Sequence, residues 1–407
     1  MKPIGASEAA DRNARFPVGA AITIDQLTGD LHPTLKRLRT TEPISWLPAI
    51  GGWLVTDYRT AVEILRDPVR FTVDDERFTT GRVVGPSMLS TDGDEHQAHR
   101  RPFESMFRRA PVVEFTDAIR RTARQLVTGF EPDGGAELRT AYAAPLATSV
   151  IASFLGFHDG SRSAAAEAEV DQRLLSAYRT IVDTVVGLGT GTSQPGDAAG
   201  AMADLGELVD RAVRHGGPMA ELADRDDVSS DRLRSNIAVI LFGAIETCEG
   251  MTANAITHVL ADGAAVRRFR TGTVKVDRVV NESLRLEPAA AVVDRYATAE
   301  IEFAGPAGPV PIAVGDLVEV SLAGANRDPS VFVDPDRFDP DRAKVGQHLA
   351  FARGPHVCLG LHLAKLQTSI ALDVLLEELP TIQLDDARST PPRGHIFRKP
   401  ERVTARW

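Results

Sequence analysis

The sequence predicts a mainly α-helical protein with small β-sheets near both ends of the chain. From Asp92 to about Ala261 the apolar residues follow a mainly helical pattern, interrupted at Gly187–Gly200. Within this stretch, Ser230–Asp262 predicts one helix of about 33 residues, roughly 50 Å long, which would cross the whole domain. Short strand-like runs lie on either side of it, at residues 44–55 and 292–320.

Length and composition fit a single globular unit. The chain has 407 residues, of which 43% are hydrophobic and 25% charged. No long Gly/Ser-rich or Pro-rich linker, repeat or low-complexity tract divides it. We therefore expect one domain over residues 1–407, with a loosely structured segment at residues 1–30.

The remaining elements follow from local signals in chain order. Before the helical stretch, we expect a helix at Pro33–Arg39, strands at Ile44–Trp46 and Trp53–Val55 around a Gly51-Gly52 turn, a helix at Tyr58–Arg66, and a polar, turn-rich loop at Phe71–Ser90. After it, we expect a helix ending at Pro288, strands at Val292–Tyr296, Ile301–Phe303, Val310–Ile312 and Leu317–Val320, a loop carrying a cysteine, a helix from about Leu359 to Leu379, and a turn-rich tail. Gly187–Gly200 predicts a connection between helices rather than a nucleotide loop, because Thr192 breaks a GxGxxG pattern and no strand precedes it.

The charge balance argues against nucleic acid as a partner. The net charge is −10 and the pI is near 5.5, whereas phosphate binding needs concentrated Lys and Arg. One basic island stands out on this acidic protein, formed by Arg100, Arg101, Arg108, Arg109, Arg120, Arg121 and Arg124. It is a solvated helix face, a docking surface for an acidic electron-transfer protein, or a source of partners for the carboxylates of a cofactor.

The cysteines and the chain start bear on the compartment. Cys248 and Cys358 are far apart and in unlike contexts, so we expect no disulfide and a reducing environment. The first residues lack the apolar core of a signal peptide. Ile237–Ile245 is too short to span a bilayer and is followed by Glu246. We therefore expect a soluble, cytoplasmic monomer without a membrane partner.

The loop that carries Cys358 has a chemical logic. The N-terminus of the following helix presents unpaired N–H groups and a positive dipole end, which favour a thiolate over a thiol. Gly354 and Gly360 permit a backbone geometry and a close approach that side chains would block. A lone cysteine is nevertheless more often a small buried apolar residue.

The segment Phe351-Ala352-Arg353-Gly354-Pro355-His356-Val357-Cys358-Leu359-Gly360 resembles the haem-binding signature of cytochromes P450. That family has Phe, Gly, His, Cys and Gly at these spacings; here Ala352 stands where it usually has Gly. The resemblance implies the P450 fold, with the long central helix over a buried haem b and Cys358 as its thiolate ligand. It also implies that Phe351 and Gly360 border the haem. Thiolate ligation favours O–O cleavage.

A second pattern lies upstream of the Cys358 loop. Glu282 and Arg285 are three residues apart and so share one helix face, an arrangement also common in surface ion pairs. The helix looks like the ExxR helix of the P450 family, which is locked to a later arginine. Arg337, in Pro335-Asp336-Arg337-Phe338, stands in the matching place. The resemblance implies a structural role for these three residues in holding the Cys358 loop.

An acid and an alcohol lie together in the long helix, as Glu246-Thr247. This is costly in an apolar helix unless the two have partners or a task; a buried Thr can also bond back to its own helix. The segment is similar to the oxygen-activating helix of P450s, with Ala244 in place of the more usual Gly beside the haem. The resemblance implies that Glu246 and Thr247 organise water for proton delivery. Such a relay also speaks against a peroxide-using peroxygenase.

The resemblance also indicates which residues surround the cofactor and the substrate. Four cationic or imidazole side chains match the positions that bind the haem propionates, for which arginine forks are well suited: His96, Arg100, Arg295 and His356. The substrate-contact regions of the family hold mostly apolar or small residues here, namely Val84, Met88, Leu89, Phe242, Gly243, Ala290, Val292, Val293, Ile396 and Phe397.

Together these patterns predict a haem-thiolate monooxygenase that inserts one oxygen atom of O2 into a small, largely apolar organic substrate. No flavin or nicotinamide domain fits within the chain, so electrons would come from a separate ferredoxin and its reductase. The strong use of Arg over Lys hints at a GC-rich bacterial genome and at tailoring of a secondary metabolite such as a polyketide. The alternatives are a peroxygenase, a catalytically silent scaffold that keeps the fold, and a haem-based gas sensor.

Overall fold

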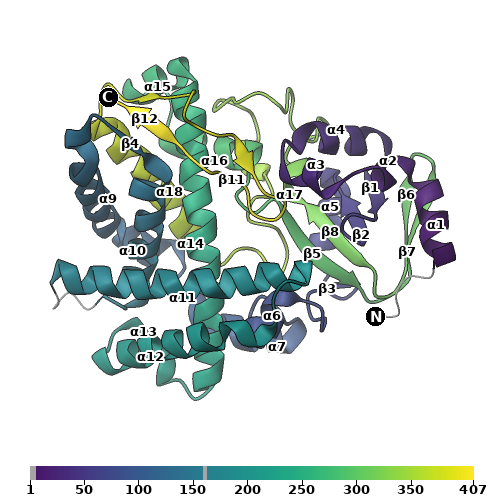
Figure 1. The fold of residues 1–407 in the computed structure, drawn as a ribbon, viewed down its shortest axis with the longest axis horizontal. Coiled ribbons are helices and arrows are strands. Elements are labelled where there is room, and N and C mark those ends of the chain that lie inside the picture. The colour runs from purple at the N-terminus through teal and green to yellow at the C-terminus, as the bar shows by residue number, and fades with distance from the viewer. Residues whose placement is uncertain (1–5, 159–162) are drawn as a thin grey trace.

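One long helix organises the molecule. In the computed structural model, which describes residues 6–158 and 163–407, α14 (Ser230–Ala261) runs through the middle of the fold (Figure 1). The Ser229 side chain caps it by accepting a hydrogen bond from the backbone N–H of Arg232 at 3.2 Å. Most of its circumference is apolar and buried, as expected for a helix in the core of a large domain. The predicted helix is confirmed to within one residue.

The other helices surround α14. α11 runs across it, α9, α10 and α18 lie on one side, and a sheet with α1 to α5 lies on the other (Figure 1). These helices are α1 (Ala6–Arg15), α2 (Pro17–Ala20), α3 (Ile24–Thr28), α4 (His32–Thr41), α5 (Tyr58–Leu65), α6 (Thr79–Val84), α7 (Gly93–Glu104), α8 (Arg109–Glu114), α9 (Thr116–Phe130), α10 (Ala144–Leu155), α11 (Ala164–Thr190), α12 (Ala199–His215), α13 (Pro218–Ala223), α15 (Gly263–Arg270), α16 (Val276–Leu286), α17 (Leu322–Ala325) and α18 (Leu361–Glu378), with a π-helical turn at Arg139–Ala143. None of the helices described is both long and apolar enough to cross a membrane.

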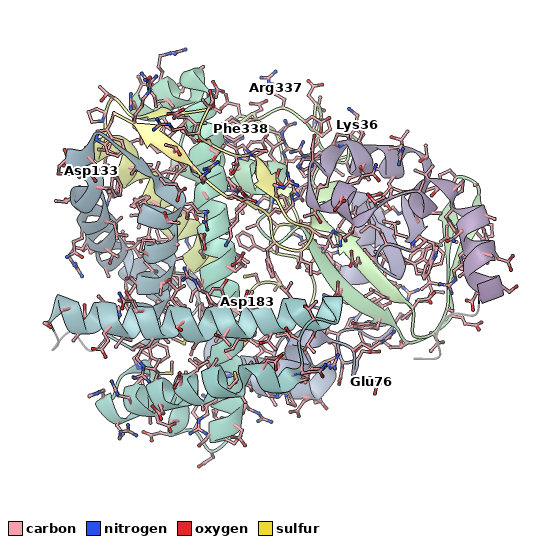
Figure 2. The ribbon with its side chains drawn as sticks, viewed as in Figure 1. Lys36, Glu76, Asp133, Asp183, Arg337 and Phe338 are labelled. Carbon is pink, nitrogen blue, oxygen red and sulfur yellow. The ribbon has the colours of Figure 1, made fainter. Side chains whose placement is uncertain are left out.

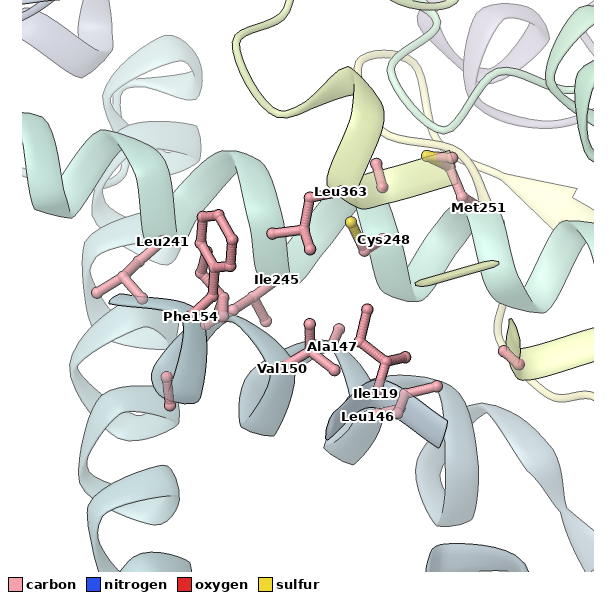
Figure 3. Packing of buried hydrophobic residues seen from close by; sticks show 14 of the residues in the cluster. Ile119, Leu146, Ala147, Val150, Phe154, Leu241, Ile245, Cys248, Met251 and Leu363 are labelled. Carbon is pink, nitrogen blue, oxygen red and sulfur yellow. The ribbon is translucent and has the colours of Figure 1, made fainter. Parts of the chain in front are cut away.

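Apolar packing fixes α14 against α10 and α18. Figure 3 shows Ala147 and Val150 of α10 facing Ile245 and Cys248 of α14, with Leu363 of α18 beside them. All five side chains are buried. Burying a side chain of the size of Val or Leu stabilises the fold by about 1.5–3 kcal/mol. Because α18 begins directly after the Cys358 loop, this packing also determines how far that loop lies from α14.

The strands confirm the predicted sheets near both ends of the chain. One sheet has the order β1-β2-β8-β5-β3, in which β2 and β8 are parallel and the other pairs antiparallel. Three smaller sheets have the orders β6-β7, β4-β12-β9 and β10-β11. The strands are β1 (Ile44–Leu47), β2 (Gly52–Val55), β3 (Phe71–Thr72), β4 (Gly135–Glu137), β5 (Val292–Ala297), β6 (Ile301–Gly305), β7 (Gly308–Ile312), β8 (Leu317–Ser321), β9 (Gln383–Leu384), β10 (Pro392–Arg393), β11 (Lys399–Pro400) and β12 (Thr404–Arg406).

The N-terminal segment is ordered, contrary to the expectation of a loose segment at 1–30. Residues 6–28 form α1, α2 and α3, whereas residues 1–5 lie outside the described part of the chain. The Phe16 ring packs edge-on against Trp53, with ring centroids 5.0 Å apart. Arg12 donates to the Asp316 carboxylate at 3.1 Å and its guanidinium lies over the Trp46 ring. These long-range contacts hold a segment whose local sequence signals are weak.

The loop predicted at Phe71–Ser90 is also partly regular. Its start forms β3, in which Phe71 pairs with Ala297 of β5, and α6 follows. The Asp92 carboxylate accepts hydrogen bonds from the Val73 N–H at 2.9 Å and the Thr72 hydroxyl at 2.7 Å. Asp92, which lies just beyond the predicted loop, therefore supports the first turn of that loop.

A buried charge network joins α16 to the segment that precedes the Cys358 loop. Glu282 and Arg285 are fully buried and bonded twice, both at 2.8 Å. The third member is Arg342, whose Nε donates to the Glu282 carboxylate at 2.9 Å. Arg285 also reaches the carbonyl of Asn326 at 3.0 Å. The Asn326 side-chain oxygen in turn accepts from the Leu349 N–H at 2.6 Å, which ties the network to the start of the Cys358 loop.

The expectation that Arg337 completes this network is wrong. Its side chain is 70% exposed and lies at the edge of the molecule, 3.8 Å from Asp339 (Figure 2). Only its backbone carbonyl takes part, accepting from Arg285 and Arg342. The sequence repeats Asp-Pro-Asp-Arg at 334–337 and 339–342, and the arginine of the second copy is the buried one.

We expect Arg342→Met to destabilise the protein strongly and Arg337→Met to leave its stability almost unchanged. Removing Arg342 leaves buried Glu282 with one cation instead of two, and breaking a buried ion pair costs about 3–5 kcal/mol. Exposed substitutions cost within about 0.5 kcal/mol. Urea unfolding followed by circular dichroism measures both variants, and equal midpoints would contradict the assignment.

Candidate functional site

The Cys358 loop, residues 351–360, is closed by its own backbone. The Cys358 N–H donates to the Phe351 carbonyl at 3.0 Å, and the Val357 N–H donates to the Gly354 carbonyl at 3.1 Å. Gly354 has φ of 76°, and a Cβ there would lie 2.2 Å from the Leu65 carbonyl oxygen. Only glycine fits this position. The loop therefore presents Cys358 from a backbone locked against α5.

Two further positions in the loop differ in what they require. Ala352 has φ of 55°, in the left-handed region, where a side chain costs about 1–2 kcal/mol. A glycine would adopt this geometry without that cost. Gly360 has φ of −83°, and a Cβ would meet only Phe107, at 3.9 Å. The protein around Gly360 therefore does not itself require glycine, in contrast to Gly354.

The Cys358 thiol is accessible, although protein surrounds it. Burial raises the pKa of the thiol, while the Gly360 N–H and the nearby Arg100 guanidinium act in the opposite direction. The Gly360 N–H at the start of α18 therefore lowers the pKa of the thiol as expected, but burial raises that pKa by more. Both cysteines are free, and Cys248 is buried under α18.

The middle of α14 borders an open space. Gly243 is exposed, and no described atom lies within 4 Å of where a Cβ would stand. On both sides along the helix, Leu241 and Ile245 are buried. Ala244 is half-buried, and Thr247 lies one turn after Gly243 on the same face. α14 therefore presents small residues and one hydroxyl to this space.

Glu246 and Thr247 have different partners. The Thr247 hydroxyl donates to the Gly243 carbonyl, the back-bond that sequence reasoning held as the alternative to a catalytic role. The Glu246 carboxylate accepts a hydrogen bond from the Tyr178 hydroxyl and pairs with the Lys399 ammonium at 2.8 Å. Burial, followed by the charge of Glu246, raises the pKa of Tyr178, so its hydroxyl remains a donor.

The four predicted propionate partners come together from three parts of the chain. The His96 ring of α7 lies 4.3 Å from the His356 ring of the Cys358 loop, centroid to centroid. Arg100 of α7 donates to the Val357 carbonyl at 2.9 Å. Arg295 of β5 is 5% exposed, and His356 bonds to Asp92 at 2.7 Å. Arg100 and Arg295 both influence the pKa of His356, which places all four groups in one electropositive cluster.

Carboxylates already lie near both arginines of the cluster: Glu104 pairs with the Arg100 Nε at 3.2 Å, and Asp92 and Asp294 lie near Arg295. Burial lowers the pKa of His96 to about 4, helped by His356 and Arg100. Burial also lowers the pKa of Arg295 to about 10. For Asp92, burial acts upward, but hydrogen bonds from His356, Thr72 and Val73 bring its pKa down to about 2.

These residues fit haem b. The Nε2 atom of His96 is buried without a hydrogen-bond partner in the described structure, and an orphaned polar atom calls for one. The two propionates of haem b would supply acceptors to His96, Arg100, Arg295 and His356. Cys358 would then bind the iron, and Phe351 and Gly360 belong to the same loop.

The substrate-contact candidates divide into two groups. Phe242, which directly precedes Gly243 in α14, packs edge-on against Phe397 with ring centroids 5.4 Å apart, and Phe397 pairs with Ala290, so these three residues lie together. The Met88 N–H donates to the Asn236 side chain of α14 at 2.9 Å. Val84 and Met88 belong to the core cluster that includes much of α14 and Leu89 packs against it, while Ile396 is 43% exposed.

The valines of β5 do not join the Phe242–Phe397 group. Val292 is buried in a cluster with Leu31 and Leu54 of the N-terminal region, so its assignment as a substrate contact is wrong. Val293 packs against the cluster on the opposite face of the sheet. Adjacent residues of a strand point to opposite faces of the sheet. The prediction that both Val292 and Val293 contact the substrate did not take this alternation into account.

Sequence reasoning missed several residues that support the site. Lys399, Tyr178 and Asp92 are the partners of Glu246 and His356, and each lies more than 60 residues away along the chain. No local pattern marks such partners. Arg342 could have been found, because the repeated Asp-Pro-Asp-Arg offers two candidates.

Comparisons with known proteins agree with this geometry. The family model for cytochrome P450 matches residues 275–404. The cytochrome P450 monooxygenase PikC of Streptomyces venezuelae is 30% identical over 88% of this chain and 85% of its own length. Nocardicin C N-oxygenase of Nocardia uniformis subsp. tsuyamanensis is 30% identical over 96% of this chain and 98% of its own.

Solved structures share the fold. P450BioI, in complex with an acyl carrier protein carrying hexadec-9Z-enoic acid, has a TM-score of 0.81 and 26% identity, covering 95% of this chain and 100% of its own. CalO2 has a TM-score of 0.82 at 22% identity, covering 95% and 98%. With the Cys358 loop and the cationic cluster, these likenesses lead to one conclusion. The chain belongs to the cytochrome P450 family and is a haem b-dependent P450 monooxygenase.

Proposed function

We propose that this monooxygenase inserts one oxygen atom of O2 into a bulky, largely apolar small molecule, as a tailoring step on a secondary metabolite such as a polyketide. The observation that carries the proposal is the pair of aromatic rings, Phe242 and Phe397, beside accessible Gly243 on α14. An aromatic and small-residue lining favours apolar ligands. The likeness to nocardicin C N-oxygenase supports a tailoring role.

Haem b, when bound, supplies the chemistry that activates O2. The residues of this chain position it and move protons. Cys358 would hold the iron, and His96, Arg100, Arg295 and His356 would bind the propionates. Thr247 offers a hydroxyl at the open face of α14, and Glu246 follows it in sequence as the source of protons. A peroxygenase would need no such pair, and a silent scaffold would not need Cys358.

Electrons would come from a separate ferredoxin and its reductase. Of the seven arginines in the basic island, Arg100 turns inward, and Arg120 and Arg124 pair with Glu377 and Glu378 of α18, each at 3.0 Å. Arg124 is exposed but paired in this way, and the other exposed members are Arg101, Arg108, Arg109 and Arg121. These exposed members are the part of the island available for docking an acidic partner.

The best substrate test is a panel of apolar secondary metabolites scored by the spin-state shift of the haem, which reports displacement of the iron's water ligand. We expect bulky apolar compounds to give the shift and small polar compounds to give none. Phe397→Ala should weaken the shift, because it removes one ring of the aromatic pair. A panel in which only polar compounds bind would overturn the proposed substrate class.

Cys358 should be the iron ligand. The reduced protein with carbon monoxide should show the red-shifted Soret band of thiolate ligation, and Cys358→Ser should lose it. Cys248→Ala is the matched control, because it removes the other thiol and should keep the band. A histidine-type spectrum in the unaltered protein would sink the assignment.

Thr247→Val should uncouple electron use from product formation. Valine keeps the shape but removes the donor, so more hydrogen peroxide should form per turnover, by up to about 10²-fold for a general-acid relay. Thr257→Val is the control, because Thr257 makes the same back-bond, to the Ala253 carbonyl at 2.9 Å, further along α14. If both variants keep normal product yield per electron, Thr247 only satisfies its helix carbonyl.

Charge reversal at Arg108 or Arg109 should slow reduction by ferredoxin. Exposed opposite charges steer association, and salt screens them over about 8–10 Å, so rising ionic strength should slow the reduction of the unaltered protein too. Arg388→Glu is the control, because Arg388 is 78% exposed and lies in the C-terminal region. If stopped-flow reduction shows no salt dependence and equal rates in all variants, the basic island is only a solvated helix face.

A further inference from the structure

One short segment follows the face of α14 that carries Glu246. Phe397 packs on Phe242, and the Arg398 carbonyl accepts from the Asn254 side chain at 3.2 Å. Between these two contacts, the Lys399 ammonium lies against α14. A Cβ at Gly250 would stand 3.4 Å from the Arg398 carbonyl oxygen, so the segment approaches the helix backbone closely.

The Lys399 ammonium bridges two carboxylates of successive turns. It lies 2.8 Å from Glu246 and 3.0 Å from Glu249. Glu249 has a second cation, Arg139, at 2.7 Å. The other partner of Glu246 among the described residues is the neutral hydroxyl of Tyr178. Within the described structure, Lys399 is therefore the cation that balances Glu246.

The ion pairs of Lys399 with Glu246 and Glu249 are partly buried. The side chains of Lys399 and Glu246 are only 21% and 14% exposed, and that of Glu249 is 8% exposed. Partly buried charges interact more strongly than charges in water, and an unpaired one is costly. One oxygen of Glu246 faces Lys399 and the other accepts from Tyr178, so both carboxylate oxygens are held.

We infer that Lys399 is a positioning residue for Glu246, which determines where the acid stands relative to Thr247. The inference rests on the proposed role of Glu246 in proton delivery. Because Lys399 follows Phe397 by two residues, one segment positions both a wall of the substrate region and the acid. The substrate side and the proton side of the site are thereby linked through residues 397–399.

A purely structural role for Lys399 is already filled by its neighbour. Arg398 is 2% exposed and donates to Glu287 at 2.6 Å, to the Gly394 carbonyl at 2.8 Å and to the Pro392 carbonyl at 2.9 Å. These bonds hold the segment without Lys399. Removing the ammonium should therefore release Glu246 while leaving the path of the chain unchanged.

The test compares Lys399→Met, Lys399→Arg and Glu246→Gln in the haem-loaded protein. We expect Lys399→Met to keep its haem content and its substrate-induced spin shift, but to lower product per reducing equivalent several-fold and to raise peroxide. Lys399→Arg should restore most of the yield, because it keeps the charge. Lys36→Met is the control, since Lys36 is 66% exposed and pairs with Asp336 at 3.1 Å on the outer surface.

Hydrogen exchange of residues 392–400 supplies a readout that does not depend on turnover. We expect unchanged protection in Lys399→Met, because Arg398 still anchors the segment. Raised exchange together with uncoupling in both Lys399 variants would make the role structural and overturn the inference. Normal coupling in Lys399→Met with uncoupled Glu246→Gln would overturn it as well. Normal coupling in Glu246→Gln would instead overturn the proposed proton-delivery role.

Discussion

The buried carboxylate of Glu282 is the interaction on which the rest of the site depends. It receives Arg285 from its own helix and Arg342 from the segment that follows, and all three side chains are almost fully buried. Charges in such a place are tolerated only when each is paired. From Arg285 the hydrogen bonds continue through Asn326 to Leu349, two residues before the loop of Cys358 begins. The position of the Cys358 sulfur therefore depends on this buried charge network, which lies outside the loop itself.

Buried ion pairs also join the C-terminal region to the helices. Arg398 reaches Glu287, just beyond α16, and Lys399 reaches Glu246 and Glu249 on α14. Burial acts upward on the pKa of Glu287, but His32, Arg398 and Arg327 bring it down to about 2. Apolar packing would hold these elements together without specifying which residues face each other. Paired charges add that specification, because a shifted register would leave a buried charge unpaired.

The sequence predicted those parts of the fold whose signals are local. Helical spacing located α14, and the Cys358 loop was found from its own residues. Three outcomes depended on distant contacts: the packing of Phe16 on Trp53, the choice of Arg342 over Arg337, and the partners of Glu246. In the first, tertiary contacts stabilise helices whose local sequence signals are weak. In the second, two identical Asp-Pro-Asp-Arg segments offer equivalent candidates for the buried arginine. A pair formed across 150 or more residues leaves no trace in either neighbourhood.

The separation of these partners has a consequence for synthesis on the ribosome. Glu287 precedes Arg398 by 111 residues, and Glu249 precedes Lys399 by 150. At about 5–20 residues per second, the acids wait roughly 6–30 s for these two cations. During that interval Glu249 has Arg139 as its cation and Glu287 has His32, but each lacks the partner that the C-terminal segment brings. The ion pairs of these two acids are therefore completed only after residues 398 and 399 have emerged, near the end of synthesis.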